Sequence, residues 1–288
     1  MTLLVFDIGG TAVKHALFKE GRLQKTSRFQ TPKTWGEMTE QMLSVRDSHT
    51  QESIEGIAIS SPGVVDDENG VVRGISAVPY LHHFPIVAEL ENLFQLPVSI
   101  ENDANCAALA ELSFGVAKDV RDLAFFVIGS GVGGAVILDR QLRKGKDLFA
   151  GEFGLMTMFP DITLSESVSP VRLAEKYSAS SQLPAITGAD LFSLADAGDE
   201  RAREIADGFY SDLSRAILNV ALILNPDLIV IGGGISSRDG LLEELRRRIQ
   251  CLKTNLGIEE LSCDLAICQY HNDSNLLGAA SKFINQFC

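Results

Sequence analysis

The sequence predicts an α/β protein made of two domains that share one plan. Strand patterns alternate with helical patterns along all 288 residues, and no low-complexity linker interrupts them. Two segments, LLVFDIGGTAVKHALF (3–18) and LAFFVIGSGVGGAVIL (123–138), repeat the order of strand, glycine turn and strand. A third apolar strand, in LIVIGGG (228–234), also runs into glycines. The repeated arrangement indicates an internal duplication and hence two α/β domains.

The first half of the chain is expected to open with a β-hairpin over 3–18. Residues 34–37 (TWGE) fit the capping box of a helix that continues with apolar residues at helical spacing. The run IEGIAISSPG (54–63) is typical of a buried strand that ends in a Pro-Gly turn. The Asn-Gly pair at 69–70 is the strongest short hairpin signal, and it predicts a second, smaller hairpin.

A further helix in the first half is expected between Pro85, which suits a first helical turn, and Pro97, which stops it. Strand VSI (98–100) then leads directly into a helix that begins within ENDANCAALAE. Four polar side chains therefore stand at one junction between a strand and a helix: Glu101, Asn102, Asp103 and Asn105.

In the second half, the predicted hairpin over 123–138 is followed by a polar, irregular stretch from about Phe159 to Ser169. A long helix then ends in the run ILNVALIL (217–224), which is expected to be buried, and stops at the Asn-Pro pair at 225–226. Three more elements are expected: a helix carrying Leu241, Leu242, Leu245, Ile249 and Leu252, a strand in DLAICQ, and a helix from about NLLGAA onward.

The composition excludes several classes of function. Lys and Arg total 25 against 38 Asp and Glu, and this charge of −13 argues against binding to nucleic acid or to anionic lipid. The five cysteines are odd in number and form no C-x-x-C pair, so neither a disulfide framework nor a zinc knuckle is indicated. The N-terminal segment has no basic region typical of a signal peptide. A cytoplasmic protein with reduced thiols is expected.

The first glycine turn, DIGGT, has the residues of a phosphate-binding loop. Gly9 and Gly10 let backbone N–H groups approach an anion, and Thr11 and Lys14 add donors. Asp7 supplies a carboxylate that can hold a hydrated Mg²⁺ ion. One such turn is weak evidence, because glycines at a strand end are about as often required by the backbone alone.

The second glycine turn, GSGVGG (129–134), offers another anion-binding loop. Its candidate residues are Ser130, Gly131 and Gly133. Neither turn is a Walker loop, because no GKS or GKT follows the glycines, and neither is a dinucleotide fingerprint, because a hairpin comes next. Two hairpin loops that face one another across a cleft would grip a polyphosphate from both sides.

Six motifs together resemble the ROK family of repressors, open reading frames and sugar kinases. DIGGTAVK, ISSPGVV, ENDANCAALAE, IGSGVGGAVI, AGEFG and LIVIGGGIS occur in the family's order and at roughly its spacing, over nearly the whole chain. The resemblance implies an actin-like, hexokinase-like (ribonuclease H-like) fold with two α/β domains and mixed β-sheets around a central cleft. The expected domains are 1–116, joined by the last helix at 274–288, and 117–273.

The reaction implied by the resemblance is transfer of the γ-phosphoryl group of ATP to a sugar hydroxyl, with Mg²⁺ as the metal. The third glycine turn would then lie at the adenosine, with Gly232, Gly233 and Gly234 as its residues. The resemblance makes Asp103 the catalytic base, with Asn102 beside it hydrogen-bonding the sugar. A carboxylate within hydrogen-bond reach of the attacking hydroxyl suffices for this chemistry. The alternative is that Asp103 only caps the helix, as aspartate commonly does.

Other sugar contacts are implied by the resemblance less uniformly. Gly63 in SSPG and Glu152 in AGEFG match sugar-pocket positions of the family. Leu155 replaces the histidine of the usual GEFGH, and FPDITLSES replaces the cysteine-rich zinc signature, so no structural zinc is expected. Glu166 in that segment either matches a sugar-binding glutamate or is an exposed loop carboxylate. Ala77 stands where glucokinase-like members have a sugar-binding asparagine, which argues against strict glucose specificity.

Two alternatives to an active kinase follow from the same resemblance. ROK repressors carry a helix-turn-helix ahead of the kinase-like body, whereas here the first phosphate loop begins at residue 7. A sugar sensor that binds without phosphorylating is the other alternative, and both phosphate loops argue for a working kinase. Zinc-less members are similar to β-glucoside kinases, while hexose and hexosamine kinases stay open. Family members are often dimers, so a homodimer is a further alternative to a monomer.

Overall fold

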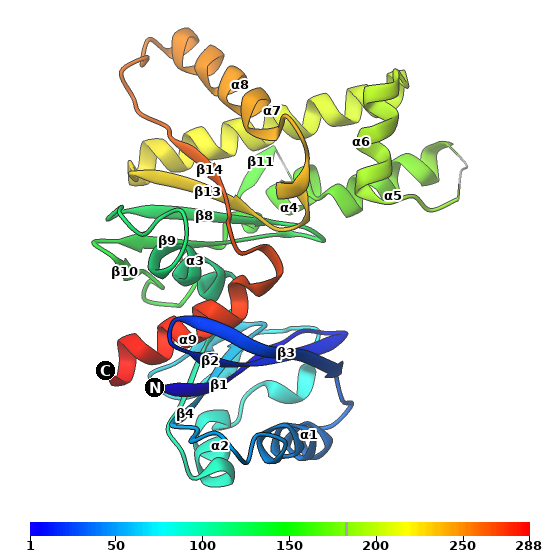
Figure 1. The fold of residues 1–288 in the computed structure, drawn as a ribbon. Helices are drawn as coiled ribbons and strands as arrows, with labels where there is room; N and C mark the ends of the chain where they lie inside the picture. The colour runs from blue at the N-terminus through cyan, green and yellow to red at the C-terminus, as the bar shows by residue number, and fades with distance from the viewer. Residues whose placement is uncertain (160, 182–183) are drawn as a thin grey trace. The chain divides into compact units, whose positions relative to one another are not determined.

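The computed structural model describes residues 1–159, 161–181 and 184–288 (Figure 1). The chain splits into two compact units. Unit 1 comprises Met1–Lys118, Gly145–Phe149 and Asn272–Cys288. Unit 2 comprises Asp119–Lys144 and Ala150–His271. Each unit is built on its own five-stranded sheet, so the expected α/β class is confirmed.

Unit 1 contains a mixed sheet with the strand order β3-β2-β1-β4-β7. The predicted hairpin is formed by the antiparallel strands β1 and β2, and β1 runs parallel to β4, which runs parallel to β7. Because β4 and β7 run the same way as β1, their carboxyl ends meet at one edge of the sheet. The bounds are β1 Thr2–Ile8, β2 Ala12–Lys19, β3 Arg22–Gln30, β4 Gly56–Ser61 and β7 Val98–Asn102.

Helices cover both faces of this sheet. Leu4, Phe6 and Ile8 of β1 share one buried cluster with Met38 of α1 (Trp35–Asp47) and with residues of α2 (Ile86–Phe94). Side chains alternate along a strand, so Asp7 points to the opposite face. That face is covered by α9 (Ser274–Phe287), which also packs against α3 (Asp103–Ser113). Figure 1 shows α1 and α2 on one side of the blue strands and α9 on the other.

The contact between α3 and α9 is unusually close. A Cβ added at Gly278 of α9 would stand 1.7 Å from the carbonyl oxygen of Cys106 in α3, so only glycine allows this crossing. A Cβ at Gly56 would likewise meet the ring of Phe283 at 2.1 Å, because α9 also packs on β4. These two contacts hold α9 against α3 and against the first residue of β4.

The predicted local signals of unit 1 are largely confirmed. Thr34 and Glu37 form the capping box that begins α1. The small hairpin consists of β5 (Val64–Asp66) and β6 (Val71–Arg73), and Gly70 adopts a φ of +64° before β6. A short 3₁₀ helix, η1 (Pro79–Leu81), precedes α2. The helix α2 ends at a left-handed Gln95, two residues before Pro97.

Unit 2 repeats the sheet plan of unit 1. Its strand order is β10-β9-β8-β13-β14, with β8 and β9 forming the predicted hairpin and β8, β13 and β14 running parallel. The predicted duplication is therefore confirmed at the level of strand order and direction. The bounds are β8 Leu123–Ile128, β9 Val132–Leu138, β10 Gln141–Leu142, β13 Leu228–Gly232 and β14 Leu265–Ile267.

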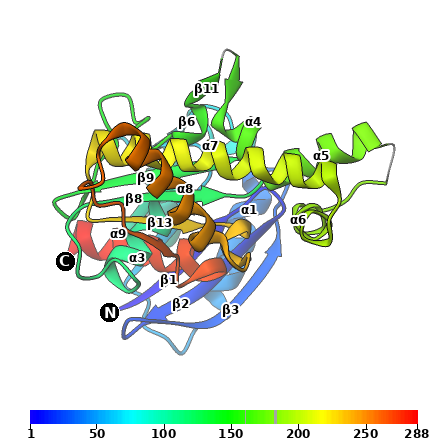
Figure 2. The ribbon, with the colours of Figure 1, turned by 90° about the horizontal axis from the view of Figure 1, so that it is seen from above.

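The helices of unit 2 are more numerous than those of unit 1 within the described parts of the chain. The long helix α7 and the helix α8 lie side by side (Figures 1 and 2). The bounds are α4 Leu164–Val168, α5 Pro170–Ser181, α6 Gly188–Ala197, α7 Glu200–Leu224 and α8 Leu241–Leu256. The short elements are η2 Phe153–Leu155, β11 Thr157–Phe159, β12 Ile162–Thr163 and η3 Gly234–Ser237, and η4 His271–Asp273 precedes α9.

Two expectations for the second half are wrong. The segment from Phe159 to Ser169 is not irregular, because β12 and α4 occupy most of it; its Pro160 lies outside the described residues. The run ILNVALIL (217–224) is not wholly buried, since Leu222 is 51% exposed and Ile223 76%. The helix α7 is amphipathic, and these two side chains belong to its exposed side. None of the helices in the described residues combines the length and the hydropathy that a membrane span requires.

Candidate functional site

The polar residues 101–105 form the junction between β7 and α3, and Asn102 is the helix cap. The Asn102 side-chain oxygen accepts hydrogen bonds from Ala104 N at 2.9 Å and Asn105 N at 3.1 Å. Asn102 is extended and Asp103 is the first helical residue. The N-cap of α3 is therefore Asn102, the residue before Asp103, and the catalytic role of Asp103 stays a prediction.

The Asp103 carboxylate is oriented by two neighbouring donors. Its Oδ1 accepts from the Asn102 side-chain amide at 3.0 Å and from Ala104 N at 2.8 Å. The first helical position also places the carboxylate at the positive end of the helix dipole. Asp103 is half-buried, so it is both fixed in direction and accessible.

Gly63, in the turn between β4 and β5, anchors Asn102. Its carbonyl oxygen accepts a hydrogen bond from Asn102 Nδ2 at 3.0 Å. The φ of Gly63 is +97°, and an added Cβ would stand 3.0 Å from Val72 and 3.2 Å from the Arg73 carbonyl. A left-handed backbone in so tight a space requires glycine. Gly63, Asn102 and Asp103 are thus joined by hydrogen bonds, and their expected contact with sugar stays a prediction.

Asp7 lies at the end of β1 and is 7% exposed. Its Oδ1 accepts hydrogen bonds from Ser60 Oγ and from Asn275 Nδ2, each at 3.0 Å. Lys14 Nζ lies 3.7 Å from Asp7 Oδ2 and donates to the carbonyl of Asn272 at 3.0 Å. Sequence reasoning found Asp7 and Lys14 but missed Ser60 and Asn275. A serine inside an apolar strand and the polar first residue of NLLGAA are their weak signals.

Strand register places Asp7 and Glu101 in one row across the sheet of unit 1. Asp7 pairs with Ser60 across β1 and β4, and Ser60 pairs with Glu101 across β4 and β7. Cys106 is fully buried beside this row, and burial raises the pKa of its thiol well above the usual range. The charges of Glu101, Asp7 and Asp103 raise that pKa further, which indicates that all three lie near the same thiol. The thiol is a protonated filler rather than a nucleophile.

The Asp7 carboxylate fits a role in holding Mg²⁺. In the described residues, no group of three or more His, Cys, Asp or Glu side chains is arranged to hold a metal. Mg²⁺, however, keeps several waters and is commonly held by one or two carboxylates together with substrate phosphates. A single buried carboxylate whose direction is fixed by Ser60 and Asn275 is consistent with that mode. The expectation of no structural zinc stays a prediction.

The glycines of the first loop are explained by packing. A Cβ at Gly9 would stand 2.9 Å from the Ala12 carbonyl, and one at Gly10 would stand 2.6 Å from the Ala77 side chain. Thr11, which follows these two glycines and precedes β2, is exposed at the tip of the hairpin. The loop is therefore kept narrow by its own neighbours, and Ala77 is part of its wall.

The glycines of unit 2 divide into two kinds. A Cβ at Gly232 would meet Phe125 at 2.8 Å, and one at Gly233, whose φ is +82°, would meet the Ile128 carbonyl at 2.4 Å. At Gly234 nothing lies within 4 Å, and at Gly131 the only neighbour is Ser165 Oγ at 3.6 Å. Packing within the described residues therefore does not require glycine at Gly131 and Gly234, and their contact with nucleotide stays a prediction.

The remaining predicted residues of unit 2 have distinct surroundings. Ser130 is exposed beside Gly131, and Gly133 lies in β9 opposite Val127. Burial raises the pKa of the Glu152 carboxyl, which precedes η2. Leu155, the residue in place of the family histidine, is 58% exposed at the end of η2.

Glu166 lies in the first turn of α4, and its side chain is held by hydrogen bonds. Its Oε2 accepts from both the backbone N and the Oγ1 of Thr163 at 2.8 Å, which completes the capping box of α4. These hydrogen bonds from Thr163 lower the pKa of the Glu166 carboxyl. The carboxylate thus has a structural role, and its contact with a sugar stays a prediction.

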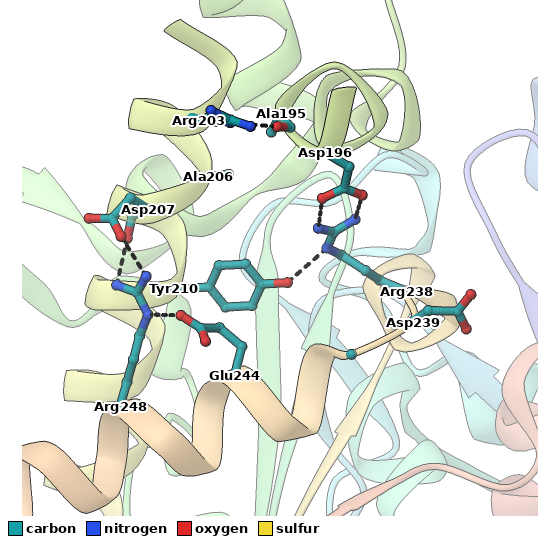
Figure 3. A pocket seen from close by; sticks show the side chains of 11 residues that line it. Ala195, Asp196, Arg203, Ala206, Asp207, Tyr210, Arg238, Asp239, Glu244 and Arg248 are labelled. Atoms are coloured by element: carbon teal, nitrogen blue, oxygen red, sulfur yellow. Dashed lines mark hydrogen bonds and ion pairs between the residues drawn. The ribbon is translucent and has the colours of Figure 1, made fainter. Parts of the chain in front are cut away.

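A pocket of about 460 Å³ in unit 2 was not predicted from the sequence (Figure 3). It is lined by residues of α6, α7 and α8 and of the segment that follows η3. Arg238 at its wall donates to both carboxylate oxygens of Asp196, at 2.9 and 3.1 Å, and to the hydroxyl of Tyr210 at 2.8 Å. Its guanidinium also lies 4.5 Å from the centre of the Phe192 ring. These contacts tie the segment after η3 to α6 and α7.

The predicted site residues are distributed over both units. Unit 1 contains Asp7, Gly9, Gly10, Thr11, Lys14, Gly63, Asn102 and Asp103, and unit 2 contains Ser130, Gly131, Gly133, Glu152, Glu166, Gly232, Gly233 and Gly234. Within unit 1 the contacts join Gly63 to the 101–105 junction and Lys14 to Asp7.

Comparison with known proteins agrees with this architecture. The chain matches the ROK family over residues 3–286. A β-glucoside kinase from Klebsiella pneumoniae is 34% identical over 98% of this chain and 96% of its own length. An N-acetylmannosamine kinase from Vibrio vulnificus is 32% identical over 98% of both proteins. A ROK family protein from Streptococcus pneumoniae, solved in complex with sucrose, is 31% identical, covers 99% of both chains and has a TM-score of 0.91.

These relatives confirm the expected actin-like fold and the expectation of a carbohydrate kinase at the level of enzyme class. The match extends over nearly the whole chain and does not depend on a single motif. The chain therefore belongs to the ROK family.

Proposed function

We propose that this protein is an ATP-dependent sugar kinase that transfers the γ-phosphoryl group of ATP to a hydroxyl of a β-glucoside, a hexose or a hexosamine. One observation supports the proposal above the others. The Asp103 carboxylate at the start of α3 is oriented by Asn102, which is itself held by the Gly63 carbonyl at 3.0 Å. A carboxylate fixed in this way is suited to accept a proton from a sugar hydroxyl.

In the proposed reaction, Asp103 accepts the hydroxyl proton while the sugar oxygen forms a bond to the γ-phosphorus. The bond between that phosphorus and the β–γ bridging oxygen breaks, and ADP leaves with the electron pair. Such transfers depend on positioning and charge stabilisation more than on a strong base. Asn102 and Glu152 are proposed to hold sugar hydroxyls, and the Glu152 carboxyl can accept hydrogen bonds from their O–H groups.

The proposed ATP site uses the three glycine turns. In unit 1, Thr11, Lys14 and the backbone of the first loop would bind phosphate oxygens, and Asp7 would hold Mg²⁺. Mg²⁺ supplies positive charge that offsets the negative charge of the phosphates. In unit 2, Ser130 and the backbone at Gly131 and Gly133 would form the second phosphate contact. Gly234, which has no neighbour within 4 Å of an added Cβ, is the position where adenosine is proposed to approach closest.

Among sugars, a β-glucoside is the first choice. The relative with 34% identity is named a β-glucoside kinase, and another with 32% identity is named an N-acetylmannosamine kinase. Ala77 lies beside Gly10 of the first loop, and an alanine side chain has no donor or acceptor for a sugar hydroxyl, which argues against a pocket built for free glucose alone. A β-disaccharide has a second sugar unit, whose contacts would replace the hydrogen bond that Ala77 does not provide.

A coupled assay of ADP release tests this proposal. Purified protein is given MgATP and, separately, glucose, N-acetylmannosamine and cellobiose. We expect ADP release that depends on sugar, with the highest kcat/KM for cellobiose. A sensor would bind one of these sugars, measured by calorimetry, without releasing ADP, and that result would contradict kinase activity. A higher kcat/KM for glucose would contradict only the choice of substrate.

A further inference from the structure

We infer that Glu101 and Lys282 act as positioning residues for Asp103, by fixing the junction that carries it from the opposite end of the chain. The inference rests on the proposed role of Asp103 as the base. Nothing in the sequence motif itself requires a lysine in the last helix. The contacts of Glu101 are therefore the starting point.

Glu101 is an acidic side chain that is 0% exposed. Its Oε1 accepts from Asn102 N at 2.8 Å and from the Asn105 side-chain amide at 3.0 Å. A carboxylate only accepts hydrogen bonds, so both partners must present N–H groups to it. The carboxylate thereby fixes the backbone of Asn102 and the orientation of the Asn105 amide, on either side of Asp103.

A buried carboxylate is costly unless a positive charge accompanies it. Lys282 of α9 supplies that charge, with Nζ 3.9 Å from Glu101 Oε2. The same ammonium forms an ion pair with Asp67, in the turn between β5 and β6. Lys282 is 19% exposed on its side chain, so water screens these interactions only weakly.

The helix α9 is held so that Lys282 cannot easily withdraw. Gly278, four residues earlier, lies against the Cys106 carbonyl, where any Cβ would collide. Residues 278 and 282 lie on the same face of a helix. Lys282 therefore faces the sheet edge where Glu101 lies, from a helix whose position is fixed by its crossing with α3.

The contacts form a continuous series from Lys282 to Asp103. Lys282 pairs with Glu101, Glu101 binds the backbone of Asn102, and the Asn102 amide donates to Asp103 Oδ1 at 3.0 Å. Loss of the lysine removes the cation that Glu101 and Asp67 share, and with it one of the contacts that orient the Glu101 carboxylate. Asp103 would keep its own chemistry but lose its fixed direction, and a misplacement of about 1 Å can cost roughly 10²-fold in rate.

The test compares Lys282→Met and Lys282→Arg with Lys25→Met, which removes an exposed lysine paired with Glu52 on the surface of unit 1. Steady-state kinetics with MgATP and the best acceptor among glucose, N-acetylmannosamine and cellobiose are measured beside the melting temperature. For Lys282→Met we expect kcat to fall about tenfold or more with both KM values within roughly twofold of the parent. Lys282→Arg keeps the charge and should recover most of kcat, and Lys25→Met should match the parent.

A solely structural role for Lys282 predicts a different result: a lower melting temperature with parental turnover per folded molecule. That result overturns the inference. Glu101→Gln is the second variant, because it has the same shape, should fold, and can only weaken the hydrogen bonds to Asn102 and Asn105. A parental kcat for Glu101→Gln also overturns the inference, even where Lys282→Met does not fold.

Asp103→Asn separates this inference from the proposed function. If Asp103→Asn is inactive while Lys282→Met and Glu101→Gln keep parental kcat, the proposed role of Asp103 as base is supported. The positioning role of Glu101 and Lys282 is then contradicted. If Asp103→Asn retains turnover, the role of Asp103 fails, whatever the other variants do. Reduced kcat in all three variants, with recovery in Lys282→Arg, supports both.

Discussion

The side-chain amide of Asn275 donates to Asp7 Oδ1 over 3.0 Å, although 268 positions separate the two residues. Asn275 and Lys282 are seven residues apart on α9 and therefore share one face of the helix. One face of the last helix thus contacts both the carboxylate proposed to hold Mg²⁺ and the buried carboxylate beside the proposed base. This relationship predicts that α9 is part of the catalytic machinery as well as part of the fold.

Asn275→Ala is expected to weaken the interaction with Mg²⁺ and nucleotide. Asp7 would lose one of its two donors to Oδ1, and a hydrogen bond to a charged group contributes about 1.5–3 kcal/mol. We expect the Mg²⁺ concentration for half-maximal rate, and the Kd for MgADP measured by calorimetry, to rise about tenfold or more. The sugar KM should change little.

Asn92→Ala, at an exposed position of α2, is the matched control and should leave both quantities unchanged. An Asn275→Ala protein that binds MgADP as the parent does, while melting at a lower temperature, would assign the Asn275–Asp7 contact to stability alone.

Gly234→Val is expected to weaken ATP binding without loss of stability. Nothing lies within 4 Å of an added Cβ at Gly234, so the Cβ of valine meets no atom in the free protein, and the side chain would occupy the space proposed for adenosine. We expect the KM for ATP to rise about tenfold or more, with an unchanged melting temperature and sugar KM. An unchanged KM for ATP would place the nucleotide elsewhere.

Gly233→Val provides the contrast. Its φ of +82° and the Ile128 carbonyl 2.4 Å from an added Cβ predict strain in the fold itself. The melting temperature should fall, with loss of sugar and ATP binding together. Two adjacent glycines are thus expected to fail in different ways, and a pattern in which both lose only ATP affinity would contradict the packing argument.

The sequence predicts the parts of this structure that depend on local chemistry. The hairpin turns, the Thr34–Glu37 capping box and the strand-to-helix junction at 101–105 are encoded within a few residues of each other, and each is confirmed. The strand β3 was missed, because its side chains are mostly exposed and show no apolar alternation. Its position depends on pairing with β2, which a local pattern does not report.

The candidate site shows the same limit. Asp7 and Asp103 stand in recognisable motifs, whereas Asn275 and Lys282 act on them from the last helix. A contact between residues 268 positions apart produces no local spacing pattern that a single sequence could reveal. The exposure of Leu222 and Ile223 was missed for a related reason, since which side of α7 meets the sheet is decided by packing.

Acid pH is expected to destabilise unit 1 through two buried histidines. Within the described residues, His15 Nδ1 and His49 Nε2 are buried and have no hydrogen-bond partner. Burial lowers the pKa of both imidazoles; the charge of His49 lowers the pKa of His15 further, and that of Lys25 lowers the pKa of His49. Because each folded-state pKa lies below the ordinary 6.5, the unfolded chain binds more protons than the folded one at mildly acidic pH.

The stability contributed by neutral His15 and His49 is therefore present above pH 6.5 and is lost as pH falls through the folded-state pKa values. His15→Phe is a suitable variant, because the ring lies between Phe6 and Phe29 at 6.2 and 6.0 Å. We expect its melting temperature to fall less than that of the parent between pH 7.5 and 5.0. Parallel curves for the two proteins would exclude His15 as a cause.

Asp103→Asn tests the proposed base directly. Asparagine keeps the size of the side chain, but it cannot accept the hydroxyl proton, so kcat should fall about 10²-fold or more. The melting temperature should hold, because the cap of α3 is Asn102 and not Asp103. The sugar KM should change much less than kcat, since Asn102 and Glu152 remain.

Asn102→Ala is the paired variant, and we expect it to change stability and sugar binding more than Asp103→Asn does. It removes the acceptor for Ala104 N and Asn105 N and the donor to Gly63, so the helix cap is lost at a cost of about 1 kcal/mol. Its melting temperature should fall and its sugar KM should rise. If Asp103→Asn melts early and still phosphorylates sugar at the parental rate, then Asp103 is structural. The proton must in that case be accepted by another group.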